Sequence, residues 1–149
     1  MQSHVKYTFS ILNQRLYLLN HLRKQELNVS GLTQVFMALV VARFQYALPA
    51  LAGQLSADDL HKVDAVFNKC RRWQLTSCTP YSADLIEQCD KHLFRADLNS
   101  NHCLHSILPP KKNTCGRNLR KKGHGRELPL SKTKLYKDSF LIRCLYKYI

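Results

Sequence analysis

Acidic residues are scarce in this 149-residue chain. Ten Asp and Glu residues stand against 23 Lys and Arg residues, which leaves a formal net charge of +13. A surplus of this size favours polyanionic partners, with nucleic acid first and anionic membrane surfaces second. We therefore expect RNA or DNA as the partner, and we expect no small-molecule substrate.

Long uninterrupted apolar runs are also missing. The most apolar zone, residues 32–52, is interrupted by Gln34, Arg43 and Gln45. A membrane span needs about 20 mostly apolar residues, so we interpret this zone as a buried helix and expect no membrane partner. The first 15 residues lack the apolar core of a secretory signal. We therefore expect an intracellular protein, in the nucleus or cytoplasm, with its six cysteines reduced.

Motifs that carry enzyme chemistry are absent as well. There is no Cys-x-x-Cys pair, no glycine-rich phosphate loop, and no histidine followed two places on by Asp or Glu. We therefore expect no cofactor and no catalytic activity. A structural zinc site stays open as an alternative, because several possible ligands occur without a paired thiolate motif: Cys89, His92, His102, Cys103, His105, Cys115 and His124.

The sequence does contain helical periodicity. Apolar residues recur three or four apart over residues 7–27, from a possible N-cap at Ser30 to residue 48, from Ser56 to residue 72, and over residues 81–97. Pro49 is expected to end the second helix, and the two prolines at 109 and 110 to end helical order. These patterns predict an all-α fold, a small three- to four-helix bundle with a basic, partly disordered C-terminal arm.

The Ala-Asp-Asp sequence at residues 57–59 resembles the metal-binding aspartate pair of a polymerase. Such a pair lies on a tight hairpin after an aromatic residue, and its carboxylates hold two magnesium ions. Here Ser56 takes the aromatic position and no strand pattern flanks the pair. Ser56 is a good N-cap, and carboxylates in the first turn favour the positive end of the helix dipole. We therefore interpret Asp58 and Asp59 as a helix start.

The basic residues are concentrated near the C-terminus. Residues 1–110 carry a net charge of +3, and residues 111–149 carry +10. A flexible stretch holds the candidate phosphate contacts Lys111, Lys112, Arg117, Arg120, Lys121, Lys122 and Arg126. A solvated tail or a nuclear-import signal would have the same composition, so both alternatives stay open.

A second group of candidate phosphate contacts comprises Arg71 and Arg72, which precede the only tryptophan, Trp73. Cations beside a stacking ring are typical of single-strand binders. A single Trp that ends an amphipathic helix more commonly packs inward, and we expect that for Trp73, with the two arginines on the surface.

Three segments in order resemble one family. They are "QRLYLLNHLRK" at residues 14–24, "FMALVVARFQYALPAL" leading into "LSADDLHKVDAVFNKCRRW" at 36–73, and "NSNHCLHSILPP" followed by "ELPLSKTKLYKDSFLIRCL" at 99–145. This order is similar to the region after the polymerase palm in reverse transcriptases of non-LTR, LINE-type retrotransposons. The last string is the most specific part of the resemblance.

The resemblance implies a thumb-like helical domain at residues 1–108, a basic linker at 109–126 and a C-terminal segment at 127–149 that could dock on the helices. Leu51 replaces the family's tryptophan, and the family's usual proline is missing at Ile142 and Arg143. The palm, the fingers and the endonuclease have no counterpart. The expected function is that of a noncatalytic, retrotransposon-derived fragment that binds RNA or DNA nonspecifically through the phosphate backbone. The alternatives are a helical protein-interaction module and a translated remnant without function.

Overall fold

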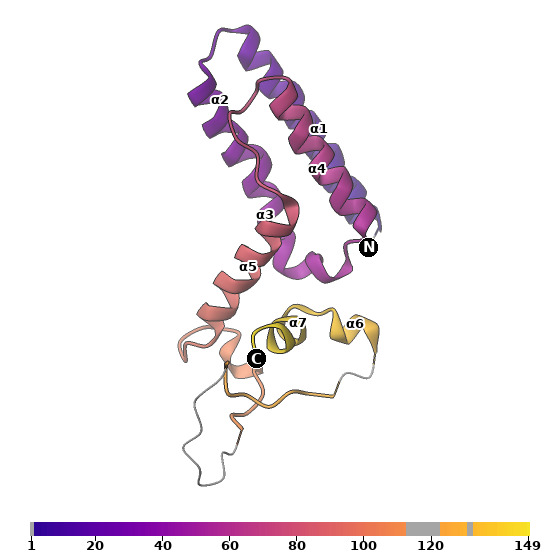
Figure 1. Cartoon of the computed structure of the whole chain (residues 1–149), viewed down its shortest axis with the longest axis vertical. Coiled ribbons are helices and arrows are strands. Elements are labelled where there is room, and N and C mark those ends of the chain that lie inside the picture. Colours follow the sequence, from indigo (N-terminus) through magenta and orange to yellow (C-terminus); the bar gives the residue numbers. More distant parts are fainter. Residues whose placement is uncertain (1, 113–122, 131–132) are drawn as a thin grey trace.

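The computed structural model describes residues 2–112, 123–130 and 133–149, and it confirms the all-α fold class. Helix α1 (Gln2–Lys24) is followed by α2 (Val29–Phe36), a π-helical segment η1 (Met37–Val41) and α3 (Ala42–Leu51). A short 3-10 turn, η2 (Ala52–Gln54), leads into α4 (Ala57–Arg72). The helices α1 and α4 run side by side in the same direction, and the continuous rod α2–η1–α3 runs antiparallel beside them (Figure 1).

Two local expectations about the second helix are wrong. Asn28, and not Ser30, is the N-cap of α2, because its Oδ1 accepts the N–H of Gly31 at 2.7 Å. Pro49 lies inside α3 and does not end it. It lies two residues before the C-terminal end of α3 and supplies no backbone N–H to the helix.

The start of α4 confirms the interpretation of Asp58 and Asp59 as helix-start residues. Ser56 Oγ accepts the N–H of Asp59 at 3.2 Å, and Asp59 Oδ2 accepts the N–H of Ser56 at 3.2 Å, which together form a capping box. The hydrogen bonds from Ser56 lower the pKa of Asp59 below its ordinary value. The stabilisation is therefore complete at neutral pH and is lost as the pH falls through this lowered pKa.

Replacing Ser56 with Ala should reduce the free energy of unfolding by about 0.5 to 2 kcal/mol, because an exposed helix donor loses its partner. Chemical denaturation at pH 7 measures this loss.

The double variant Asp58→Ala, Asp59→Ala should leave magnesium and manganese binding unchanged. Stoichiometric metal binding that disappears in this double variant would overturn the helix-start interpretation.

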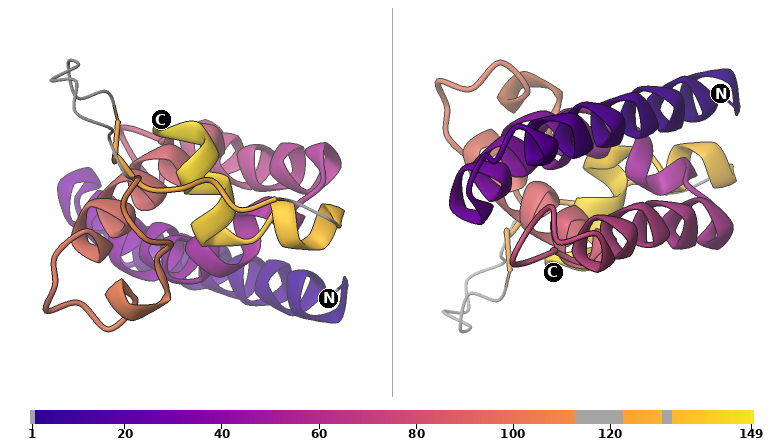
Figure 2. Two further views of the ribbon diagram at one scale, coloured as in Figure 1. Left: turned by 90° about the horizontal axis from the view of Figure 1, so that it is seen from below. Right: turned by 90° about the horizontal axis from the view of Figure 1, so that it is seen from above.

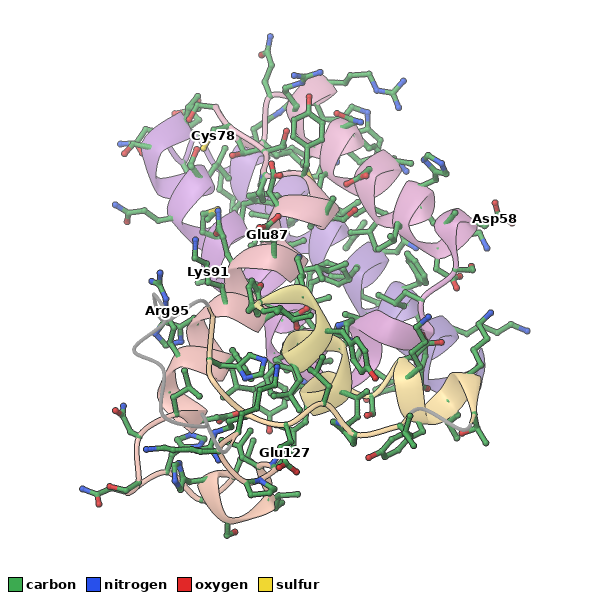
Figure 3. All side chains as sticks on the ribbon, turned by 60° about the horizontal axis from the view of Figure 1, so that its bottom comes forward. Asp58, Cys78, Glu87, Lys91, Arg95 and Glu127 are labelled. Atoms are coloured by element: carbon green, nitrogen blue, oxygen red, sulfur yellow. The ribbon has the colours of Figure 1, made fainter. Side chains whose placement is uncertain are left out.

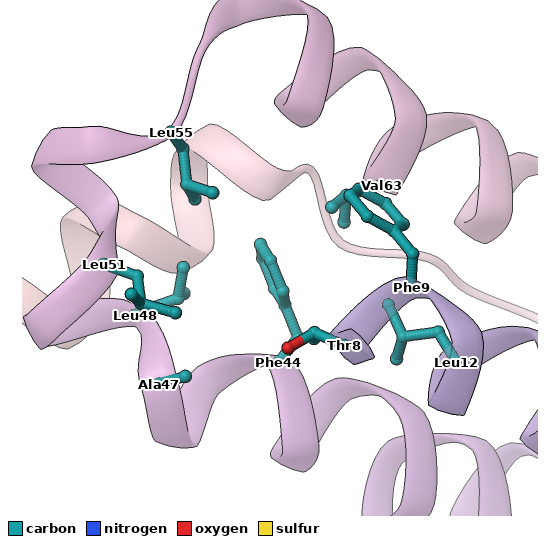
Figure 4. Close-up of a pocket in the computed structure, with 9 residues that line it drawn as sticks. All are labelled: Thr8, Phe9, Leu12, Phe44, Ala47, Leu48, Leu51, Leu55 and Val63. Atoms are coloured by element: carbon teal, nitrogen blue, oxygen red, sulfur yellow. The ribbon is translucent and has the colours of Figure 1, made fainter. Parts of the chain in front are cut away.

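The main core lies between α1, the α2–α3 rod and α4. Phe67 of α4 is 1% exposed, and its ring meets the rings of Phe36 and Phe44 edge to face, with centroids 5.9 and 6.1 Å apart. Beside this cluster an apolar cavity of about 20 Å³ is lined by residues of α1, α3 and α4 (Figure 4). It has room for about one water molecule, so we interpret it as a packing gap.

The rod α2–η1–α3 is less central than the sequence suggested. Its buried residues Leu32, Phe36, Val40, Phe44 and Leu48 face the core, while the opposite side is open. By length and composition the stretch Val29–Gln54 could span a membrane. In the structure, 28% of its most apolar part is buried. One such helix is weak evidence, because the core helix of a soluble protein meets the same criteria.

Helix α5 (Ser82–Asp97) packs on α3 and α4 and extends beyond them (Figure 1). Asp64 of α4 anchors its first turn by accepting the N–H and the hydroxyl of Ser82 at 2.9 and 3.0 Å. A 3-10 turn, η3 (His105–Ile107), then precedes the two prolines, and α6 (Lys134–Lys137) and α7 (Phe140–Lys147) complete the chain.

A second, smaller core joins α5 to the C-terminal segment. Its buried members are Phe94, Leu108, Ile142, Cys144 and Leu145. Helix α7 lies beside α5 and η2 (Figure 2). Within the C-terminal segment predicted at 127–149, the described helix α7 therefore packs on the helical body.

The predicted linker at 109–126 lies largely outside the described residues. Its two ends are paired, since the N–H of Lys112 donates to Gly125 O and the N–H of Glu127 donates to Pro110 O, both at 2.9 Å. A single antiparallel bridge, Lys111 with Arg126, forms there. The described ends of the linker are thus held against each other.

Candidate nucleic-acid interface

The two parallel helices α1 and α4 end side by side, and both end with cationic side chains. The last turn of α1 carries His21, Arg23 and Lys24, and the last turn of α4 carries Lys69, Arg71 and Arg72. Arg23 Nη1 donates to the carbonyl of Trp73, which ties the two helix ends together. We call the group Arg23, Lys24, Lys69, Arg71, Arg72 and Trp73 the basic end.

The expectation that Trp73 packs inward is wrong, because its side chain is 40% exposed. The reason lies in the C-cap of α4. Gln74 has a positive φ of 55°, its N–H donates to Arg71 O, and the N–H of Leu75 donates to Cys70 O. This Schellman arrangement turns Leu75 into the core, where it is 0% exposed. Leu75 thus takes the buried position that the sequence assigned to Trp73.

The basic end combines a ring with cations. Lys69 Nζ lies 4.4 Å from the centroid of the Trp73 ring, a cation–π contact. Arg71, Arg72 and Lys24 are exposed, and among the described residues none of them makes an ion pair with a carboxylate. These cations also balance the negative ends of two helix dipoles, which gives them a structural role beside any ligand contact.

The linker cations fall into three groups. Lys111 and Lys112 are exposed beside the Lys111–Arg126 bridge. Arg126, which the sequence grouped with the phosphate contacts, is 6% exposed, because its Nη1 donates to Pro109 O at 2.8 Å and its Nη2 lies 3.4 Å from His105 Nε2. The remaining candidates lie outside the described residues: Arg117, Arg120, Lys121 and Lys122.

Sequence reasoning missed two cations on α5. Lys91 and Arg95 are exposed, four residues apart, and point to the same side of the helix (Figure 3). Their neighbour Glu87 lies 3.9 Å from Lys147. The i, i+4 spacing of Lys91 and Arg95, with Glu87 one turn before them, was the available signal.

The possible zinc ligands are not gathered. Within residues 2–112, 123–130 and 133–149, no group of three His, Cys, Asp or Glu side chains is placed to hold a metal ion. His124 Nε2 lies 2.9 Å from Leu145 O, while His124 Nδ1 accepts the N–H of Arg126 at 3.0 Å. Burial raises the pKa of Cys70 and Cys144 to about 12, so these thiols stay protonated. Cys115 lies outside the described part.

The comparisons with known proteins give no relative. No protein-family model, no curated protein and no solved structure matches the chain.

Proposed function

We propose that this protein is a noncatalytic nucleic-acid-binding protein that contacts the phosphate backbone without reading the base sequence. The observation that carries the proposal is the basic end, where Lys24, Arg71 and Arg72 are exposed without carboxylate partners among the described residues. Cations presented at a helix end neutralise phosphates, and contacts to phosphates carry no sequence information. The net charge of +13 supports the same conclusion.

The resemblance to the region after the palm of non-LTR reverse transcriptases adds an origin to this proposal. We propose that the chain is a retrotransposon-derived fragment that keeps nucleic-acid contact without polymerase chemistry. The Asp58 and Asp59 carboxylates are used at the start of α4, where Asp59 is bound to Ser56. RNA and DNA are both suitable partners, because each presents the phosphate groups on which binding depends.

The salt dependence of binding tests the proposal. Each neutralised phosphate contributes about 0.9 to the slope of log K against log salt on duplex DNA and about 0.7 on single strands. The double variant Arg71→Gln, Arg72→Gln should therefore flatten the duplex slope by about 1.8 and weaken all sequences alike. Fluorescence anisotropy with labelled oligonucleotides at several salt concentrations measures both effects.

The matched control is Lys62→Gln, Lys137→Gln, which removes the same charge from exposed residues away from the basic end. This control should leave the slope nearly unchanged.

The linker cations are best replaced in place, as Arg117→Gln, Arg120→Gln, Lys121→Gln and Lys122→Gln, because a chain ending at Pro110 would also lose α7 and uncover Phe94. If the original protein shows no salt-dependent binding to RNA or DNA, the proposed function is wrong.

A second candidate function is protein interaction, and the open side of the α2–η1–α3 rod favours it. Tyr46 is 84% exposed, Val29 49% and Met37 41%. Exposed apolar side chains on one helix are suited to a partner surface. Sedimentation velocity across a concentration series tests whether this side joins two copies, and self-association that Tyr46→Glu abolishes would support the interaction function.

A further inference from the structure

Helix α5 forms the wall between two hollows on the surface. The first, of about 460 Å³, is lined by polar residues together with Ala96: Gln88, Lys91, His92, Arg95 and Asn99. The second, of about 350 Å³, is lined by Lys91, Phe94, Arg95, Leu98, Gly123, His124 and Tyr148. Lys91 and Arg95 belong to both. Volumes of this order are typical of sites for small ligands or ligand fragments.

The two hollows differ in chemistry. The first offers two cations, an imidazole and two amide side chains, which suits an anion. The second is mainly ring-lined and apolar: the Tyr148 ring stacks on Phe94 with centroids 5.6 Å apart, and the His124 ring stands edge-on to Phe94 at 5.8 Å. Their arrangement resembles the two halves of a nucleotide, a charged phosphate and a flat base.

The ring-lined hollow is fixed in place before any ligand arrives. Both nitrogens of His124 are engaged by the backbone, Nε2 with Leu145 O and Nδ1 with the N–H of Arg126. Its ring therefore presents mainly carbon surface to a ligand. Gly123 lets the backbone beside His124 pack closely against the C-terminal residue Ile149, since a Cβ at Gly123 would lie 2.0 Å from the carbonyl carbon of Ile149. A preformed site loses less entropy on binding.

Charge complementarity selects the ligand. Lys91 and Arg95 are exposed and make no ion pair with a carboxylate among the described residues, and the carboxylate of Glu87 faces Lys147. Two cations four residues apart on a helix repel each other, and a bound phosphate would relieve that repulsion.

We propose that these two hollows hold one nucleotide of a single-stranded nucleic acid, with its phosphate on Lys91 and Arg95 and its base against Tyr148 and His124. This inference rests on the proposed function and adds the substrate class. A base paired inside a duplex cannot enter the ring-lined hollow, so the site selects single strands. The N–H of Lys112 donates to Gly125 O, which brings Lys111 and Lys112 close to His124. These two lysines extend the cationic surface.

The test compares three oligonucleotides of equal length and label: a single strand, the same strand with abasic sugars, and the duplex. Anisotropy titrations on the full chain should show the base-bearing strand binding about five- to 160-fold more tightly than the abasic one, the range expected for stacking one base. The variant Lys91→Gln, Arg95→Gln should flatten the single-strand salt slope by about 0.7, because one phosphate loses its cations. Tyr148→Leu should remove the preference for bases and leave the slope unchanged.

Three further measurements keep the outcome decisive. Leu98→Ser, at a partly exposed position in the ring-lined hollow, should reduce the base preference without disturbing the Phe94 core, so it replaces Tyr148→Leu if that variant unfolds. A free nucleoside monophosphate should compete with the labelled strand if the site holds a nucleotide unit. Quenching of the single tryptophan, Trp73, by the base-bearing strand alone would place the base at the basic end and overturn the inference.

Failure of the inference and failure of the proposed function are distinguishable. If all three oligonucleotides bind with a salt-dependent affinity but Lys91→Gln, Arg95→Gln and Tyr148→Leu change nothing, the α5 site is wrong and the proposed function stands. If none of them binds, the proposed function fails, and the α5 site fails with it.

Discussion

Replacing Arg143 with Met should release the C-terminal segment from α5 while the α1–α4 body stays folded. The Arg143 guanidinium donates twice to Asp90, from Nη2 to Oδ1 at 2.6 Å and from Nε to Oδ2 at 3.1 Å. Asp90 is 1% exposed. Removing the arginine leaves a buried carboxylate without its cation, which costs about 3 to 5 kcal/mol.

Hydrogen exchange measured by mass spectrometry checks this result. Amides of residues 140–147 should lose protection, and amides of residues 57–72 should keep theirs, because the second core is separate from the main one. The control is Lys147→Met, which removes a partly exposed cation 3.9 Å from Glu87 and should change protection little.

A second variant disturbs the same junction while keeping both partners of the ion pair, Arg143 and Asp90. A Cβ at Gly53 would lie 1.9 Å from Asp138 O and 2.7 Å from Arg143 Nη1. Gly53→Ala should therefore push the start of α7 away and give the same exchange pattern as Arg143→Met. Cooperative loss of protection across α1 and α4 in both variants would contradict the independence of the two cores.

Replacing Phe67 with Ala should have the largest effect on the stability of the main core. The ring is 1% exposed and packs edge to face against Phe36 and Phe44. Phenylalanine to alanine changes at such sites cost about 3 to 5 kcal/mol. Domains of this size have a total stability of about 5 to 15 kcal/mol, so we expect a large fall in Tm.

Thermal unfolding followed by circular dichroism measures the effect of Phe67→Ala. The matched control is Tyr46→Ala, which removes an aromatic ring that is 84% exposed and should change stability by less than about 0.5 kcal/mol. Equal losses in the two variants would mean that the main core does not depend on the Phe67 ring contacts.

Short-range signals in the sequence predicted the helices well. Ser56 and the two aspartates after it form a local motif, and the capping box follows from three or four neighbouring residues. The π-helical turn at Met37–Val41 was not predicted, because its register depends on the partners that Val40 and Val41 meet in the core. The sequence therefore predicted which segments are helical, but it did not predict the π-helical turn within one of them.

The candidate site was predicted less completely than the fold. Arg71, Arg72, Lys111 and Lys112 were proposed as phosphate contacts from charge alone, and all four are exposed. Trp73 and Arg126 were misplaced, because the competition of Leu75 for the buried position and the carbonyl of Pro109 become visible only in three dimensions. Lys91 and Arg95 line one hollow with residues 123, 124 and 148, which are far away in sequence.

The division into two cores sets an order of events during synthesis of the chain. All buried members of the main core lie between Leu12 and Leu85, whereas the second core needs residues from Phe94 to Leu145. Since synthesis proceeds from the N-terminus and completed units fold first, the α1–α4 body can form while α7 has not yet been made. Until then Phe94 stays uncovered and Asp90 faces water. A nascent chain stalled before Arg143 would therefore have a folded α1–α4 body, while the C-terminal half of α5 would still lack its packing partner.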